Sequence, residues 1–83
     1  MHVAVLHQPR VEDRVVALFV DLAERFGRVT PDGVTIDLSL THELIGQLVG
    51  SRRPTVSLAL QVLAAEGVLS RRSERWELAH GVM

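Results

Sequence analysis

Two short helices separated by a glycine are the strongest structural prediction that this sequence makes. Thr41 can begin the first helix, because its hydroxyl can accept a hydrogen bond from an unpaired first-turn N–H. Gly50 can end it, because glycine adopts a left-handed backbone conformation at no steric cost. The apolar residues between them recur at helical spacing and predict a buried stripe. This stripe comprises Leu44, Ile45, Leu48 and Val49.

A second helix is predicted to begin at about Ser51 or Arg52 and to end at Glu66-Gly67. Pro54 suits its first turn, where no N–H has a partner within the helix. The residues expected on its inner stripe are Val56, Ala59, Leu60 and Leu63.

Two helices joined by a turn of about three or four residues that contains a glycine form a helix-turn-helix. Gly46 lies on the inner side of the first helix, and its small size would let the two helices cross closely. The pattern favours the DNA-binding version of this unit. An ordinary helical hairpin is the alternative interpretation.

A longer helix and two β-hairpins are predicted around this pair. Residues 28–38 contain a Pro-Asp-Gly turn and then alternate apolar and polar residues, which predicts a half-buried strand. Residues 68–78 predict a second hairpin, the wing, joined across Ser73-Glu74 with Trp76 packed under the sheet. The long helix covers residues 11–26. Its expected core positions are Val11, Val15, Leu18, Phe19, Leu22 and Phe26.

The segment Leu40-Thr-His-Glu-Leu-Ile-Gly-Gln-Leu-Val-Gly50, followed by Arg53-Pro-Thr-Val-Ser57, closely resembles the DNA-binding domain of the cyclic-AMP receptor protein and fumarate-nitrate regulator superfamily. The resemblance covers roughly residues 11–79, and its Leu-Val-Gly-x-x-Arg-x-Thr-Val core is a specific motif. It implies an α+β winged helix-turn-helix with three main helices and two small β-hairpins. Residues 1–10 would then be an N-terminal arm or hinge remnant, and residues 80–83 a tail.

The resemblance implies sequence-specific DNA binding as the output module of a transcriptional regulator. The second helix, about residues 52–66, would enter the major groove, and the wing, about residues 68–78, would lie on the backbone. Arg53 occupies the position of the family's principal guanine-reading arginine. Further candidates for base contact are Ser57, Leu58 and Gln61. Candidates for phosphate contact are Thr41, His42, Arg52, Thr55, Arg71, Arg72 and Arg75.

The chain departs from the best-known members at two positions that read bases. Those members have a glutamate directly after the arginine and a further arginine one turn on, where this chain has Pro54 and Leu58. Proline donates nothing, and leucine can at most contact a thymine methyl group. The family's well-known operator therefore cannot be transferred to this chain.

The charge distribution supports DNA binding more than the net charge of −1 does. Residues 1–50 carry four arginines and seven acidic residues, whereas residues 51–76 carry five arginines and two acidic residues. A DNA-binding surface needs a positive face rather than a positive total. All nine basic residues are arginine, which suits bidentate contacts, although a GC-rich genome would produce the same bias.

The sequence carries no catalytic or metal-binding pattern, so we expect neither an enzyme nor a cofactor in this domain. There is no cysteine, and the four histidines lack the i, i+4 spacing of a helical metal pair. No apolar run approaches about 20 residues, and residues 1–7 lack the basic start of a signal peptide. A cytoplasmic protein that does not enter the membrane is therefore predicted.

Double-stranded DNA is the predicted partner. The resemblance also implies partners outside this chain, namely a sensory or dimerisation domain, a second copy of the chain, and RNA polymerase. The alternative is a winged helix that binds another protein without binding DNA. Leu58 and the apolar segment from Val3 to Leu6 would then form the contact surface.

Overall fold

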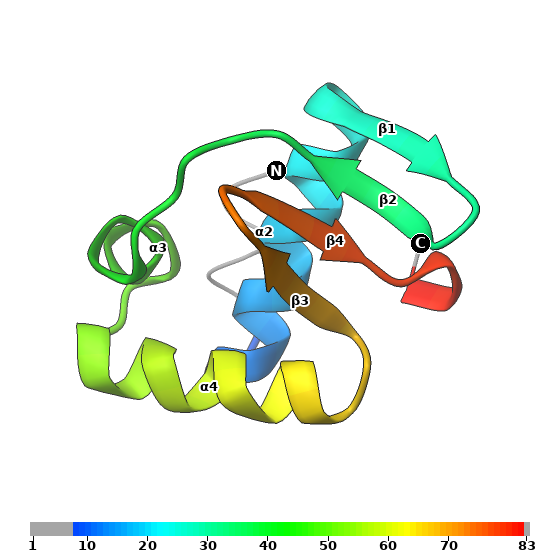
Figure 1. Cartoon of the computed structure of the whole chain (residues 1–83). Helices are drawn as coiled ribbons and strands as arrows, with labels where there is room; N and C mark the ends of the chain where they lie inside the picture. Colours follow the sequence, from blue (N-terminus) through cyan, green and yellow to red (C-terminus); the bar gives the residue numbers. More distant parts are fainter. Residues whose placement is uncertain (1–7, 83) are drawn as a thin grey trace.

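The computed structural model describes residues 8–82, and in this part of the chain three α-helices pack against one small antiparallel sheet (Figure 1). The elements in chain order are α2 (Val11–Phe26), β1 (Gly27–Thr30), β2 (Gly33–Ile36), α3 (His42–Val49), α4 (Arg53–Ala65), β3 (Leu69–Arg72), β4 (Arg75–Leu78) and the 3₁₀ helix η1 (His80–Val82). This arrangement confirms the predicted α+β winged helix-turn-helix.

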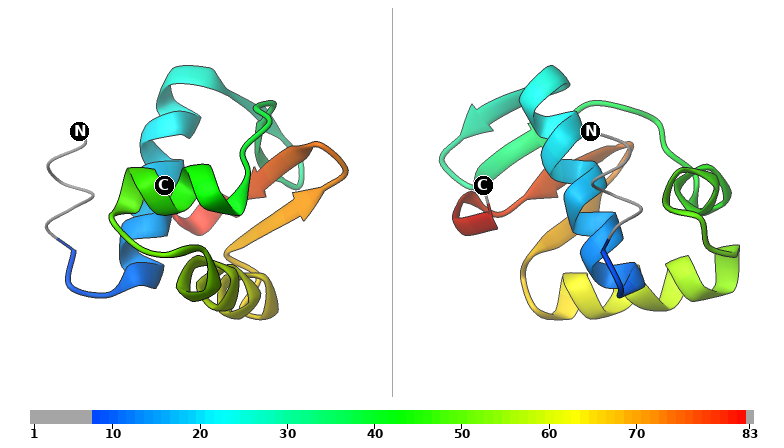
Figure 2. Two further views of the ribbon diagram at one scale, coloured as in Figure 1. Left: turned by 90° about the vertical axis from the view of Figure 1, so that its left-hand side faces the viewer. Right: turned by 180° about the vertical axis from the view of Figure 1, so that it is seen from behind.

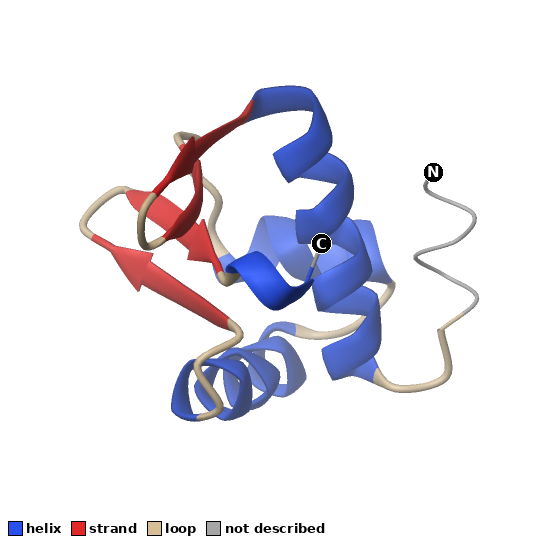
Figure 3. Ribbon diagram, turned by 90° about the vertical axis from the view of Figure 1, so that its right-hand side faces the viewer, coloured by secondary structure: helices blue, strands red, loops and turns tan. Residues whose placement is uncertain are grey.

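The long helix α2 runs through the middle of the molecule, with the sheet on one side and α3 on the other, while α4 crosses below (Figures 1 and 2). Figure 3 shows the strands gathered on one side of the helices. Val15 and Phe19 of α2 are fully buried between these layers. The predicted inner stripe of α4 is confirmed, since Val56, Ala59, Leu60 and Leu63 are all buried.

The two predicted hairpins are joined into a single sheet of strand order β1-β2-β4-β3. Strand β2 pairs with β4, which places Val34 opposite Leu78 and Ile36 opposite Trp76. The hairpin turns lie where the sequence predicted them, before Gly33 and across Ser73-Glu74. The pairing between the hairpins was not predicted, because it links segments that are far apart in the chain.

Two residues predicted to be buried are exposed. Phe26 is 57% exposed, because it is the last residue of α2 and the chain turns there into an extended Gly27. Leu44 is 38% exposed, because the short helix α3 presents Ile45 and Val49 to the core and cannot bury a wider stripe. The predicted aromatic core of α2 therefore consists of Phe19 without Phe26.

Two details of the predicted boundaries and burial also differ. The helix α4 begins at Arg53, one residue beyond the predicted start, because Arg52 is an N-cap with extended backbone angles of φ −82° and ψ 156°. All four residues of β2 are buried, whereas a half-buried strand was predicted. Thr35 lies between Arg28 of β1 and Glu77 of β4, so its outward face is covered by neighbouring strands.

Candidate nucleic-acid interface

The turn between α3 and α4 has the geometry that its sequence predicted. Thr41 Oγ1 accepts a hydrogen bond of 3.0 Å from the backbone N–H of Leu44, and Gly50 is left-handed at φ 71°. Gly46 is buried against the turn, where an added Cβ would lie 2.5 Å from the carbonyl oxygen of Ser51. The N-cap, the helix end and the close approach at Gly46 are thus confirmed.

Arg14 of α2 connects this helix pair to the rest of the molecule. Its Nη1 donates to the carbonyl oxygen of Val49 at 3.3 Å, and its Nε donates to the carbonyl oxygen of Gln8 at 2.8 Å. The last carbonyl groups of a helix have no partner within the helix, so the first bond stabilises the end of α3. No sequence pattern indicated this role, because the two residues are 35 positions apart.

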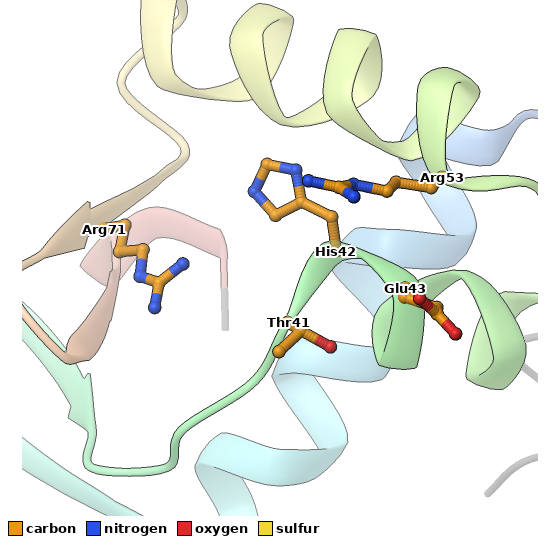
Figure 4. A pocket seen from close by; sticks show the side chains of 5 residues that line it. All are labelled: Thr41, His42, Glu43, Arg53 and Arg71. Atoms are coloured by element: carbon orange, nitrogen blue, oxygen red, sulfur yellow. The ribbon is translucent and has the colours of Figure 1, made fainter.

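A pocket of about 380 Å³ lies where α3, α4 and the wing meet. Figure 4 shows its five lining residues: Arg53 extends from the start of α4, His42 and Glu43 from α3, and Arg71 from the wing, with Thr41 just before α3. Within residues 8–82, neither arginine of this pocket is in an ion pair. Four of the predicted DNA-contacting residues are thereby brought together from three elements.

A second hollow of about 300 Å³ continues from this pocket between α4 and the wing. His42 and Arg71 line both hollows, and Ser57, Gln61 and the buried Trp76 also line the second one. His42 Nδ1 and Ser57 Oγ are 2.8 Å apart and form a hydrogen bond between α3 and α4. Two predicted base-contacting residues, Ser57 and Gln61, therefore lie on the same side of α4 as the pocket.

The three arginines of the wing lie on two faces of the sheet. Arg71 is paired directly opposite Trp76, so both side chains project from the inner face toward α4. Arg72 and Arg75 project from the outer face. Arg72 Nε lies 3.6 Å from Glu77 Oε1, and Arg75 Nε lies 4.0 Å from Asp37 Oδ1. Of the three predicted phosphate contacts in the wing, only Arg71 faces the pocket.

The opposite flank of α4 has a different character. Thr55 and Leu58 line a separate hollow with Val62 of α4 and with Val11 and Glu12 of α2. Leu58 is 64% exposed there, and the remaining candidate, Arg52, is exposed at the N-cap of α4. The structure therefore does not bring Thr55 and Leu58 into the Arg53 pocket.

Glu12 adds a negative charge to this flank. Hydrogen bonding of its carboxylate to its own backbone N–H lowers its pKa, and a hydrogen bond of 3.2 Å from Arg10 Nη2 lowers it further. A glutamate is ionised at neutral pH, and the lowered pKa extends the ionised range of this carboxylate further into acid. The hollow beside Thr55 and Leu58 is thus bordered by a carboxylate that is paired with Arg10, whereas the pocket on the other flank is bordered by two arginines and Glu43.

Within residues 8–82, no cluster of three histidine or acidic side chains is arranged to hold a metal ion. None of the described helices combines the length and the apolar character that crossing a membrane requires.

The family model for the Crp-like helix-turn-helix domain matches residues 13–79 of this chain. A global nitrogen regulator of Synechococcus elongatus is 37% identical over 62 residues, which are 75% of this chain and 28% of the regulator. The OCPA-complexed structure of CprK superimposes with a TM-score of 0.78 at 26% identity, over 93% of this chain and 36% of that chain.

A CRP-family transcriptional regulator from Thermus thermophilus superimposes with a TM-score of 0.77 at 25% identity, over 94% of this chain and 40% of that chain. The chain therefore spans less than half of the length of each of these three relatives. The family match, the observed winged helix fold and the similar regulators all indicate the same kind of domain. The chain belongs to the family of Crp-like helix-turn-helix domains and is a DNA-binding domain of transcription regulation.

Proposed function

We propose that the N-terminal half of α4 enters the major groove and that Arg53 reads a guanine there. The observation that carries this proposal is the convergence of Arg53, His42 and Arg71 on one exposed pocket from three elements. A guanidinium can donate two parallel hydrogen bonds to guanine O6 and N7. Arg53 is free to do so, since no acidic side chain within residues 8–82 pairs with it.

The other base contacts would follow the exposed surface of α4. Gln61 is exposed and lies two turns beyond Arg53, and Ser57 lies between them. An amide can pair with the edge of adenine, and a hydroxyl can donate to or accept from several bases. Leu58 would contact a thymine methyl group from the other flank of the helix.

The phosphate contacts would frame this surface. Thr41 and His42 lie before and at the start of α3, and Arg71 reaches from the wing. Arg52 and Thr55 are exposed in the first turn of α4 and complete the set on the helix side. Further candidates at the wing tip are Arg72 and Arg75, which would have to leave Glu77 and Asp37 to reach a phosphate.

We further propose that the domain acts by binding alone, without catalysis and without a cofactor of its own. It would work in the cytoplasm, where bacterial DNA is located. Its relatives are more than twice as long, so a sensory and dimerisation domain, or a second copy, would complete the regulator. RNA polymerase is the partner through which a bound regulator would act on transcription.

Protein binding is a second candidate function, and one observation favours it. Leu58 and Val62 are 64% and 41% exposed and line an apolar hollow with Val11. A partner helix could bury these side chains. The negative charge of Glu12 beside them disfavours DNA at the same place.

The salt dependence of binding separates the two functions. We expect fragmented genomic DNA to be retarded by the protein in a mobility-shift assay at low salt. If about four side chains neutralise phosphates, log K should fall against log salt with a slope of roughly −4. A control variant, Arg25→Gln, should leave the slope unchanged, because Arg25 pairs with Asp21 near the end of α2. If the affinity for DNA did not change with salt concentration, binding through phosphate contacts would be excluded and the protein-binding function would be favoured.

A further inference from the structure

The hydrogen bond between His42 and Ser57 links a predicted phosphate contact to a predicted base contact. The imidazole Nδ1 and the hydroxyl Oγ are 2.8 Å apart, and the bond is partly buried. His42 is the first residue of α3, and Ser57 lies one turn into α4. The bond therefore crosses from one helix of the helix-turn-helix to the other.

The two groups can share their hydrogens in two ways. A neutral imidazole has one donor and one acceptor nitrogen, and a hydroxyl has one hydrogen to donate. If Nε2 of His42 carries the ring hydrogen, Nδ1 must accept from the Ser57 hydroxyl. If Nδ1 carries the hydrogen, the Ser57 hydroxyl stays free to donate, and Nε2 can only accept.

A DNA phosphate decides between these two arrangements. Phosphate oxygens accept hydrogen bonds and donate none, so His42 can bond to a phosphate only through an Nε2–H donor. An imidazolium would donate from Nδ1 as well and leave the Ser57 hydroxyl hydrogen free. In the neutral imidazole, however, an Nε2–H donor commits the Ser57 hydroxyl hydrogen to Nδ1. Ser57 then presents only the lone pairs of its oxygen to a base.

We propose that His42 is a positioning residue whose neutral imidazole converts Ser57 into a hydrogen-bond acceptor when it holds a DNA phosphate. The inference rests on the proposed entry of α4 into the major groove. Adenine and cytosine carry amino groups on their major-groove edges, whereas guanine and thymine offer acceptors at the corresponding positions. The base nearest Ser57 is therefore adenine or cytosine, and that preference depends on a side chain that does not touch the base.

The positions of the surrounding groups support this role. The pocket that His42 lines is bordered by Arg53, Arg71 and Glu43, and Arg71, a proposed phosphate contact, offers a positive charge beside His42 (Figure 4). His42 lines both this pocket and the hollow that contains Ser57 and Gln61. One imidazole thus faces the predicted phosphate position and the predicted base-reading side chains together.

Two substitutions of His42 separate its two nitrogen atoms. In His42→Gln the side-chain amide can reach the Nε2 position and donate to a phosphate, but it loses the acceptor for Ser57. In His42→Asn the amide oxygen can occupy the Nδ1 position and accept from Ser57, but the phosphate donor is lost. Binding of the unmodified chain and of each variant to a randomised DNA library would be measured in alkaline buffer, because the arrangement requires a neutral imidazole.

We expect His42→Gln to bind with nearly unchanged total affinity and to lose about three- to tenfold of its preference at one base pair, the range for one hydrogen bond. We expect His42→Asn to keep that preference and to bind all sequences about three- to tenfold more weakly. In a Ser57→Ala background, His42→Gln should change no base preference. Circular dichroism melting would verify that each variant is folded.

Two results would overturn the inference. One is an unaltered base preference in His42→Gln, and the other is an altered preference that persists in the Ser57→Ala background. Failure of the proposed function would look different, because the unmodified chain would then bind the library without preference at any position. The measurements on the unmodified chain therefore test the proposed function separately.

Discussion

The guanidinium carbon of Arg71 lies 5.3 Å from the ring centroid of Trp76. The indole itself packs on Phe19, with the two ring centroids 5.0 Å apart, and Trp76 is 2% exposed. A cation above an aromatic ring is attracted by its negative face, so the buried indole restricts where this charge can lie. A positive charge on the inner face of the wing is thereby anchored to the hydrophobic core.

This anchoring predicts that Arg71 contributes more to DNA binding than Arg72 does. Arg71→Ala and Arg72→Ala remove the same charge, so any difference between them reports direct contact. We expect Arg71→Ala to reduce the salt slope by about 0.9 and to weaken binding of all sequences alike. Arg72→Ala should have a smaller effect, because Arg72 faces outward beside Glu77. Fluorescence anisotropy titrations over a salt series would measure both, and equal losses would contradict the assignment.

Substitution of Arg53 should change specificity more than affinity for random DNA. Arg53→Ala removes the side chain proposed to bond to guanine, so we expect a loss of about 1–3 kcal/mol on the preferred site. Some loss on random DNA will accompany it, because a charge is removed. The informative quantity is the ratio of specific to non-specific affinity. An unchanged ratio would mean that Arg53 contacts only phosphate.

Gly46→Ala should destabilise the helix pair. The added methyl carbon would lie 2.5 Å from the Ser51 carbonyl oxygen, so α3 and the turn would have to move apart. We expect a loss of about 1–3 kcal/mol in the free energy of unfolding, measured by urea denaturation. Gly81→Ala is the matched control, because nothing lies within 4 Å of its added carbon. If both variants were equally stable, the close approach at Gly46 would be unimportant.

Removal of the charge on Glu12 should strengthen DNA binding. Glu12 borders the hollow that Thr55 and Leu58 line and neutralises Arg10, so its removal leaves an additional positive charge near α4. We expect Glu12→Gln to bind random DNA more tightly than Glu24→Gln does, although both lose one negative charge. Glu24 lies near the other end of α2. Equal affinities would show that only the total charge matters.

The same carboxylate should stabilise the fold in a pH-dependent way. The pKa of Glu12 is lowered in the folded chain by its backbone N–H and by Arg10, so the ionised form favours folding. This stabilisation is present above the ordinary glutamate pKa and is lost as pH falls through the lowered value. The melting temperature of Glu12→Gln should therefore lie below that of the unmodified chain at neutral pH, and the difference should close in acid.

The sequence was sufficient where local chemistry decides the structure. The helix α2 was predicted with its observed bounds, because an apolar period of 3.6 residues and the flanking Pro9 and Gly27 act within a few residues. The same holds for Thr41 as a cap, for Gly50 as a left-handed end and for the buried stripe of α4. The sequence indicated Thr41, His42, Arg53 and Arg71 as separate candidates and did not predict that they line one pocket.

The sequence was insufficient where contacts between distant segments decide the structure. The pairing of β2 with β4, the bond from Arg14 to Val49 and the bond from His42 to Ser57 depend on how the helices and strands come together. Phe26 was wrongly predicted to be buried, because the helical spacing of apolar residues in α2 continues beyond the part of the helix that packs on the core. That Arg71 faces α4 while Arg72 and Arg75 face outward follows from the strand register, which a hairpin pattern alone does not specify.

The pairing of β2 with β4 has a mechanical consequence for the wing. Because Val34 and Ile36 pair with residues of β4, the wing belongs to the same sheet as β1 and β2, and we expect it to move together with them. Arg71 lies across the hollow of about 300 Å³ from α4, and we expect a duplex to fit between them by adjusting its own groove. DNA sequences differ in how easily their grooves narrow or widen. This domain should therefore discriminate among operators through base pairs that none of its side chains reaches.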